Sequence, residues 1–150
     1  MSFPRAFHYA PGFTLVELLV VIAIAAVLAA TAAPSFIDYI RRGRLIEAVT
    51  RLSDYRVRVE QYFLDNRRYD DGAGGCGGVA PAVSPADAFS VACSADATTY
   101  AIAATGLPAK GMQGFVYTID HTNAHRTLAV PDGWLASDAC WVVRRDGSCV

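Results

Sequence analysis

The chain has 150 residues, a net charge of −1 and a hydrophobic content of 53%. This length leaves room for one small domain beside an anchoring segment, and a net charge so close to zero gives no global field that would attract nucleic acid or acidic partners. One N-terminal run raises this hydrophobic content. The remainder, rich in Ala and Gly, supplies only a thin core that cross-links would help to stabilise.

The apolar run extends from Phe13 to Ala33, and Glu17 is the one acid within it. A run of this length predicts a transmembrane helix over residues 13–36. A carboxylate inside such a helix costs about 3 kcal/mol on insertion scales, and the run itself contains no partner for it. Glu17 is therefore expected either at the lipid headgroup boundary or against a positive group on another copy of the chain.

The sequence Gly-Phe-Thr-Leu-Val-Glu-Leu at residues 12–18 resembles the class III signal of type IV pilins and pseudopilins. The resemblance implies that a prepilin peptidase cuts between Gly12 and Phe13 and then methylates the new amine of Phe13. It also implies that this positive amine meets the Glu17 carboxylate of a neighbouring subunit during filament assembly.

Charges and cysteines on either side of the apolar run give conflicting indications of topology. Arg41, Arg42 and Arg44 follow the run, whereas Arg5 alone precedes it, and the positive-inside rule by itself would place the C-terminal part in the cytoplasm. All four cysteines also follow the run, which fits an oxidising periplasm, and the family's peptidase acts at the cytoplasmic face. We therefore expect an inner-membrane protein with a periplasmic C-terminal domain, which a cell-surface pilus later carries.

One helix is expected from Phe13 to about Asn66, with a change of character near residue 37. Pro34 should kink or locally unwind this helix, because proline removes one helical hydrogen bond. Beyond it, apolar residues recur at three- and four-residue steps, which predicts an amphipathic helix packed on a sheet. This apolar stripe comprises Ile37, Ile40, Leu45, Ala48, Val49, Leu52, Tyr55, Val59, Tyr62 and Phe63.

The rest of the chain predicts a small antiparallel sheet. Glycines within residues 71–78 break the helix. Alternating patterns predict strands over residues 89–93, 99–105, 115–120 and 126–130. Asn123 marks a turn, and the Asp-Gly pair at 146–147 favours a C-terminal hairpin.

Segments at residues 99–106 and 114–120, together with a Cys-Trp…Cys ending, resemble minor pilins of the PilE kind. The fold class is then α+β, the type IV pilin fold. In that fold a long N-terminal helix packs on a small antiparallel sheet that ends in a disulfide loop. The expected divisions are a leader over 1–12, a transmembrane assembly helix over 13–36 and a head domain over 37–150.

The four cysteines allow three disulfide connectivities. We expect Cys76–Cys93, which would pin the Gly-rich loop to the first strand, and Cys140–Cys149, which would close a small C-terminal loop. A zinc site is the weaker alternative, because the chain has no CxxC pair and its three histidines are not at ligand spacing.

No arrangement of residues indicates catalysis, since no nucleophile elbow surrounds any serine and the Gly-rich loop lacks the ending of a phosphate-binding loop. Arginines are the remaining candidates for binding. Arg144 and Arg145 beside Trp141, with Arg126 nearby, would suit contact with the DNA backbone, and a solvated strand face is the plainer interpretation.

The sequence thus predicts a non-enzymatic minor pilin that supports pilus biogenesis, twitching motility and adhesion, with neither cofactor nor metal. Expected partners are the prepilin peptidase, other pilin subunits, the assembly machinery of the inner membrane, and membrane lipid before assembly. One alternative is a DNA-binding minor pilin for natural transformation. Another is a pseudopilin of type II secretion, which the paired cysteines and the PilE-like tail disfavour.

Overall fold

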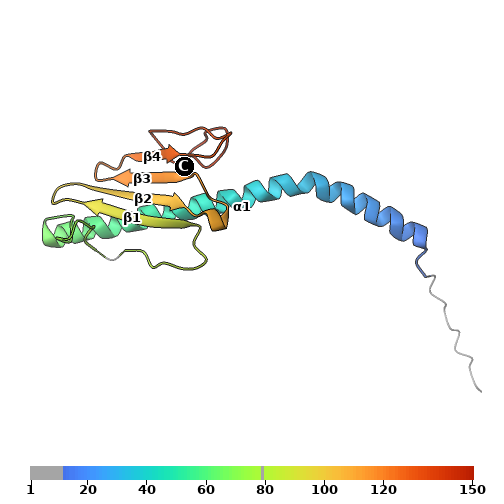
Figure 1. Ribbon diagram of the computed structural model, residues 1–150, viewed down its shortest axis with the longest axis horizontal. Helices are drawn as coiled ribbons and strands as arrows, with labels where there is room; N and C mark the ends of the chain where they lie inside the picture. The colour runs from blue at the N-terminus through green and yellow to red at the C-terminus, as the bar shows by residue number, and fades with distance from the viewer. Residues whose placement is uncertain (1–11, 79) are drawn as a thin grey trace, which may run out of the picture. The chain divides into compact units, whose positions relative to one another are not determined.

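The computed structural model of the chain describes residues 12–78 and 80–150, without the side chains of residues 31–35. In that part of the chain, one long helix, α1, is followed by four strands and a short 3₁₀ helix, η1 (Figure 1). The chain divides into two compact units, one ending at Asp38 and the other running from Tyr39 to Val150. We call the second unit the head and describe each unit by itself.

Helix α1 spans Leu15–Asn66, which confirms the long N-terminal helix predicted from the sequence. Thr14 caps its start, because the side-chain oxygen of Thr14 accepts a hydrogen bond from the backbone N–H of Glu17 at 3.2 Å. The helix ends before Arg67, whose φ of 59° is the left-handed conformation that commonly terminates helices. The backbone is helical through Pro34, but the Pro34 side chain lies outside the described residues, and the kink expected there stays a prediction.

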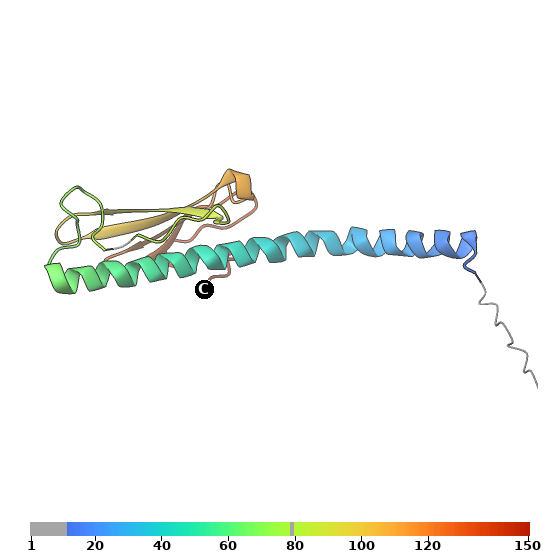
Figure 2. The ribbon, with the colours of Figure 1, turned by 90° about the horizontal axis from the view of Figure 1, so that it is seen from below.

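The strands form one antiparallel sheet in the order β1-β2-β3-β4, so each strand pairs with its neighbour in sequence. Their bounds are Phe89–Ala95 for β1, Tyr100–Gly106 for β2, Val116–Asp120 for β3 and His125–Ala129 for β4. Each overlaps a strand range predicted from the alternating patterns. Between β2 and β3, η1 spans Pro108–Lys110. Figure 2 shows the sheet lying along the part of α1 that belongs to the head.

The core of the head lies between α1 and the sheet. Alternating steps of three and four residues along α1 bring five buried side chains onto one face, namely Leu45, Ala48, Leu52, Tyr55 and Val59. Alternate positions of the strands supply the opposing buried side chains, which include Phe89, Tyr100, Ile102, Ala104, Tyr117 and Ile119. The predicted packing of an amphipathic helix on a sheet is therefore confirmed.

The first two members of the predicted stripe do not join this core. Ile37 is 57% exposed and Ile40 is 39% exposed. Ile40 lies five residues before Leu45, and at about 100° of rotation per residue this spacing turns it about 140° away from the buried face. The prediction of a stripe starting at Ile37 is therefore wrong at these positions, and the packed stripe begins at Leu45.

The C-terminal segment is held against the sheet by hydrogen bonds from buried groups. The hydroxyl of Thr127 donates to the Cys140 carbonyl at 2.8 Å and accepts the Val142 N–H at 2.9 Å. The Tyr117 hydroxyl donates to the Val142 carbonyl at 2.5 Å. The end of the segment folds back on itself around Asp146-Gly147, as the predicted hairpin requires. Val142 and Cys149 form an antiparallel bridge, and the Val143 N–H donates to the Ser148 carbonyl at 2.9 Å.

Candidate functional site

The first turn of α1 carries an exposed carboxylate. Glu17 lies three residues after Thr14, which is the spacing of a capping box, and the helix dipole favours a negative charge there. Phe13 comes directly before the cap, and its side chain is 80% exposed. The Gly12–Phe13 bond and the Glu17 carboxylate thus lie within a few residues of each other. Cleavage, methylation and intermolecular pairing at these residues stay predictions.

From Leu18 to Ala30, the surface of α1 is apolar on all sides. The side chains of Leu18, Ile24, Val27 and Leu28 are between 56% and 66% exposed. A continuous apolar surface of this kind indicates contact with lipid or with other protein chains.

Among residues with described side chains, no helix is long and apolar enough to cross a membrane. The transmembrane helix predicted over residues 13–36 includes residues 31–35, whose side chains lie outside the described ones.

Two disulfides join distant parts of the head, and both are the pairs expected from the sequence. Cys76 is bonded to Cys93, with 5.6 Å between their Cα atoms, and this bond ties the loop after α1 to β1. Cys140 is bonded to Cys149, with 5.9 Å between their Cα atoms. These bonds close two loops and restrict the unfolded chain.

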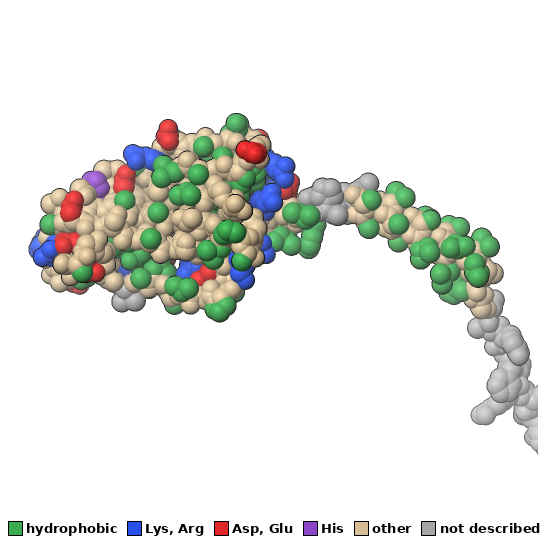
Figure 3. Space-filling view, viewed as in Figure 1, with side chains coloured by type: hydrophobic (Ala, Val, Ile, Leu, Met, Phe, Trp, Pro, Cys, Tyr) green, Lys and Arg blue, Asp and Glu red, His purple; other side chains and the backbone are tan. Residues whose placement is uncertain are grey.

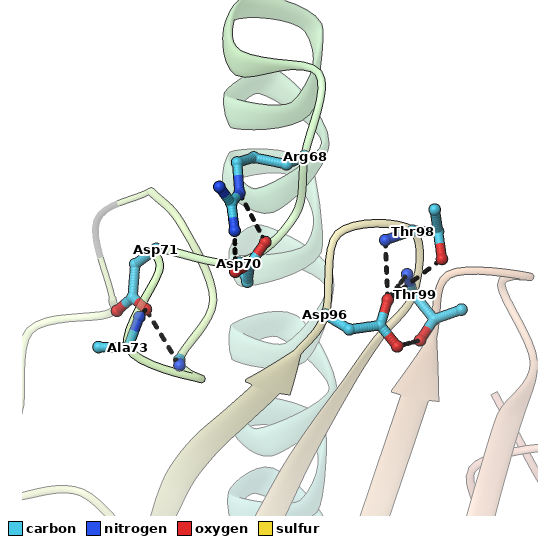
Figure 4. A network of polar contacts seen from close by, with 8 residues as sticks. Arg68, Asp70, Asp71, Ala73, Asp96, Thr98 and Thr99 are labelled. Atoms are coloured by element: carbon cyan, nitrogen blue, oxygen red, sulfur yellow. Dashed lines mark hydrogen bonds and ion pairs between the residues drawn. The ribbon is translucent and has the colours of Figure 1, made fainter.

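Aspartates organise the turns at the end of the head where α1 ends (Figure 4). Arg68 donates two hydrogen bonds to Asp70, and this pairing lowers the pKa of Asp70. Asp96 accepts the backbone N–H groups of Thr98 and Thr99, both at 2.7 Å, and the Thr99 hydroxyl at 2.8 Å. These hydrogen bonds lower the pKa of Asp96 to about 2, and the bond from the Thr98 N–H has the largest effect. The arrangement is that of a structural turn rather than a catalytic site.

A polar cluster joins α1 to the sheet near the same end. Glu60 accepts hydrogen bonds from the hydroxyls of Tyr100, at 2.7 Å, and Tyr69, at 3.1 Å. Burial, together with the Glu60 carboxylate, raises the pKa of both tyrosines. Their hydroxyls therefore stay protonated at neutral pH and act as hydrogen-bond donors.

The histidines of the β3–β4 turn point to different neighbours. His121 lies edge-on to Tyr100, with ring centroids 6.4 Å apart, and His125 stacks on Trp141 at 3.9 Å. Across the described residues, no three His, Cys, Asp or Glu side chains form a group that could hold a metal ion.

The arginines proposed for DNA contact lie on β4 and on the C-terminal loop. Arg144 and Arg145 are exposed, but Trp141 is only 3% exposed and cannot offer them an accessible aromatic face. Arg126 lies at the start of β4 and is 3.8 Å from the Asp120 carboxylate. Contact of these arginines with DNA stays a prediction.

A hollow of about 370 Å³ in the head was missed by the sequence analysis. Its lining brings Arg41 of α1 together with Arg145 of the C-terminal loop, beside Trp134, Phe115 and Asp132. Figure 3 shows Lys and Arg side chains gathered at one end of the head. In the sequence, only the run of basic residues after the apolar segment could have pointed to this site. We call this hollow the arginine pocket.

Two family models match the chain. One, described as "Type IV minor pilin ComP, DNA uptake sequence receptor", matches residues 34–114. The other, described as "Prokaryotic N-terminal methylation motif", matches residues 9–33.

Several curated proteins are similar to the chain. The fimbrial protein EcpC of Eikenella corrodens is 38% identical over 109 residues, covering 69% of this chain and 69% of EcpC. A type IV major pilin protein PilE1 of Neisseria gonorrhoeae is 36% identical over 70 residues, covering 47% of this chain and 42% of that protein. The type IV major pilin protein PilA of Myxococcus xanthus is 42% identical over 60 residues, covering 40% and 27%. The chain thus spans less than half the length of these two major pilins. No solved structure matches it.

Proposed function

Because the chain belongs to the type IV pilin family, we propose that it is a minor pilin, a structural subunit of a type IV pilus. The family consists of structural subunits of a surface pilus that are made by way of the membrane. The match of residues 34–114 to a minor pilin model supports the minor role. The subunit then contributes to pilus biogenesis, twitching motility and adhesion.

The observation that carries the proposal is the exposed apolar surface of the first part of α1, where Glu17 is the one carboxylate between Leu15 and Ala30. A prepilin peptidase cuts after Gly12 and methylates Phe13. The positive amine of Phe13 then lies against Glu17 of an adjacent subunit. This pairing removes an uncompensated charge from an apolar filament core and fixes the axial register of the subunits, because breaking a buried ion pair by removing one partner is strongly destabilising.

Before assembly, the subunit is held in the inner membrane by the first part of α1, with the head in the periplasm. The two disulfides support this placement, since such bonds persist in oxidising compartments. After assembly, the apolar surfaces of α1 from several subunits pack together and the heads face outward.

The proposal is tested by replacing Glu17 with Val and measuring the subunit both in membranes and in sheared filaments. We expect normal membrane levels and cleavage, but a fall of about tenfold or more in filament incorporation. Asp65→Asn is the matched control, because it removes an exposed carboxylate near the other end of the same helix. Wild-type incorporation of the Glu17→Val variant would refute the pairing.

DNA uptake is a second candidate function, favoured by the description of the matched family as a DNA uptake sequence receptor. Exposed arginines of the head would contact phosphates. In fluorescence anisotropy with a labelled duplex, replacing Arg126 and Arg144 with Gln should reduce the slope of log affinity against log salt by about two. An unchanged slope would exclude these arginines as the DNA contact.

A pseudopilin of type II secretion has less support. The relatives compared above are fimbrial and pilus proteins, and the signal that pseudopilins share with pilins does not separate the two. Loss of surface filaments with intact protein secretion in a deletion strain would favour the pilus.

A further inference from the structure

We propose that the arginine pocket binds the phosphate of an anionic phospholipid headgroup. The inference rests on the membrane-anchored stage of the proposed function, and it assigns a lipid site to the head itself. Its ligand is a phosphodiester carrying one negative charge, as in phosphatidylglycerol.

The charge of the lining matches such a ligand. Arg41 and Arg145 supply two positive charges and Asp132 one negative charge, which leaves a local charge of about +1 for a monoanion. Guanidinium groups bind phosphate oxygens through paired N–H donors. Each of the two arginines also makes a contact within the chain, which helps to fix its position.

Besides the charged residues, Gln113 and Gly111, the lining has an apolar part, and its volume is small. Phe115, Trp134, Pro108 and Pro131 contribute to the wall, and a volume of about 370 Å³ lies at the small end of the range for ligand sites. A headgroup with its glycerol would fill it, whereas a nucleic-acid duplex presents a row of phosphates that a single hollow cannot follow. Arginine beside Trp is also the pairing typical of a membrane interface.

The position of the pocket along α1 points to the same ligand. Arg41 follows the apolar run within about two helical turns, and Arg44 is anchored there by a hydrogen bond to the Lys110 carbonyl. Tyr39, just before Arg41, is 71% exposed and suits an interfacial position. Basic residues on the exported side run against the positive-inside bias. Binding of anionic headgroups in the outer leaflet explains why they occur there.

The test is native mass spectrometry of the full-length chain released from detergent micelles that contain a defined lipid. Phosphatidylglycerol should be retained in preference to phosphatidylcholine. Replacing Arg41 and Arg145 with Gln should lower that retention by about thirtyfold, since each basic residue near a membrane surface contributes about fivefold. The control, Arg58→Gln with Arg67→Gln, removes two charges from the later part of α1 and the residue after its end, and should leave retention unchanged.

Further variants and competing ligands distinguish the possible sources of phosphate, and folding controls identify misfolded variants. Asp132→Asn should increase retention, because it removes the one negative charge of the lining. Both disulfides and the unfolding midpoint are checked in every variant. Unchanged retention in the arginine variant, equal binding of inorganic phosphate, or displacement of the lipid by a short DNA duplex would each overturn the proposal. None of these outcomes bears on filament assembly, which sheared filaments report separately.

Discussion

Helix α1 has two parts that differ in how their apolar side chains are covered. From Leu18 to Ala30, apolar residues surround the helix, and Leu18 and Ile24 are each 56% exposed. From Tyr39 onward, one stripe of apolar residues is buried, and Leu45 and Leu52 are completely so, whereas apolar residues off the stripe, such as Val57, stay exposed. The same backbone structure therefore serves two purposes: a stripe stabilises one chain, whereas an apolar surface on every side requires lipid or other chains.

The comparison predicts opposite effects of the same substitution in the two parts. Leu52→Ala should lower the free energy of unfolding of the head by about 2–5 kcal/mol, because it leaves a cavity in a packed core. Leu19→Ala, at a side chain that is 51% exposed, should change it by less than about 0.5 kcal/mol. Denaturant unfolding of the full-length chain in detergent, followed by Trp fluorescence, measures both. Equal effects would contradict the distinction between the two parts.

Removing the disulfides tests how far the head depends on cross-links, which the first part of α1 lacks. Replacing Cys76 and Cys93 with Ser should lower the free energy of unfolding by about 3 kcal/mol. Replacing Cys140 and Cys149 with Ser should lower it slightly less, because that bond closes a shorter loop. The sequence separations are 17 and 9 residues. The reverse order in urea unfolding would show that loop length does not govern their contributions.

Thr127→Val tests the buried hydroxyl that links β4 to the C-terminal segment. Val has nearly the same shape as Thr but removes the hydrogen bonds to Cys140 and Val142. We therefore expect the free energy of unfolding to fall by about 1–3 kcal/mol. Thermal unfolding of the oxidised protein measures it. Thr98→Val, at an exposed turn position, is the control, and a similar loss there would argue against a special role for Thr127.

A smaller effect is expected at Asp96 and should depend on pH. Its folded-state pKa of about 2 lies below the ordinary value of 3.8. The contribution of the Asp96 carboxylate to the stability of the head is therefore complete above the ordinary pKa and is lost as pH falls toward 2. Asp96→Asn should destabilise the head slightly at pH 7 and not at pH 2. A stability difference that is independent of pH would show that the charge of Asp96 plays no part.

Local patterns were sufficient to predict the helix and the strands. The steps of three and four residues from Leu45 to Val59 identified the buried stripe, and alternation identified each strand. The error at Ile40 arose from a spacing of five residues, which breaks the helical face. Burial of Trp141 could not be predicted, because it depends on His125 and on the Thr118 carbonyl, which accepts a hydrogen bond from the Trp141 ring at 2.9 Å.

The candidate sites also differ in whether the sequence could predict them. Glu17 and Phe13 could be identified because their function is linked to a contiguous motif. The arginine pocket could not, because Arg41 and Arg145 lie near opposite ends of the head's sequence and meet only once the sheet has formed on α1.

The most direct test of the account is the mass of the subunit's N-terminal peptide in sheared surface filaments. If the first part of α1 is covered by other pilins after processing, that peptide begins at a methylated Phe13. If subunits in filaments still begin at Met1, the account is contradicted, because the positive amine that should pair with the Glu17 carboxylate would then be absent from the helix start.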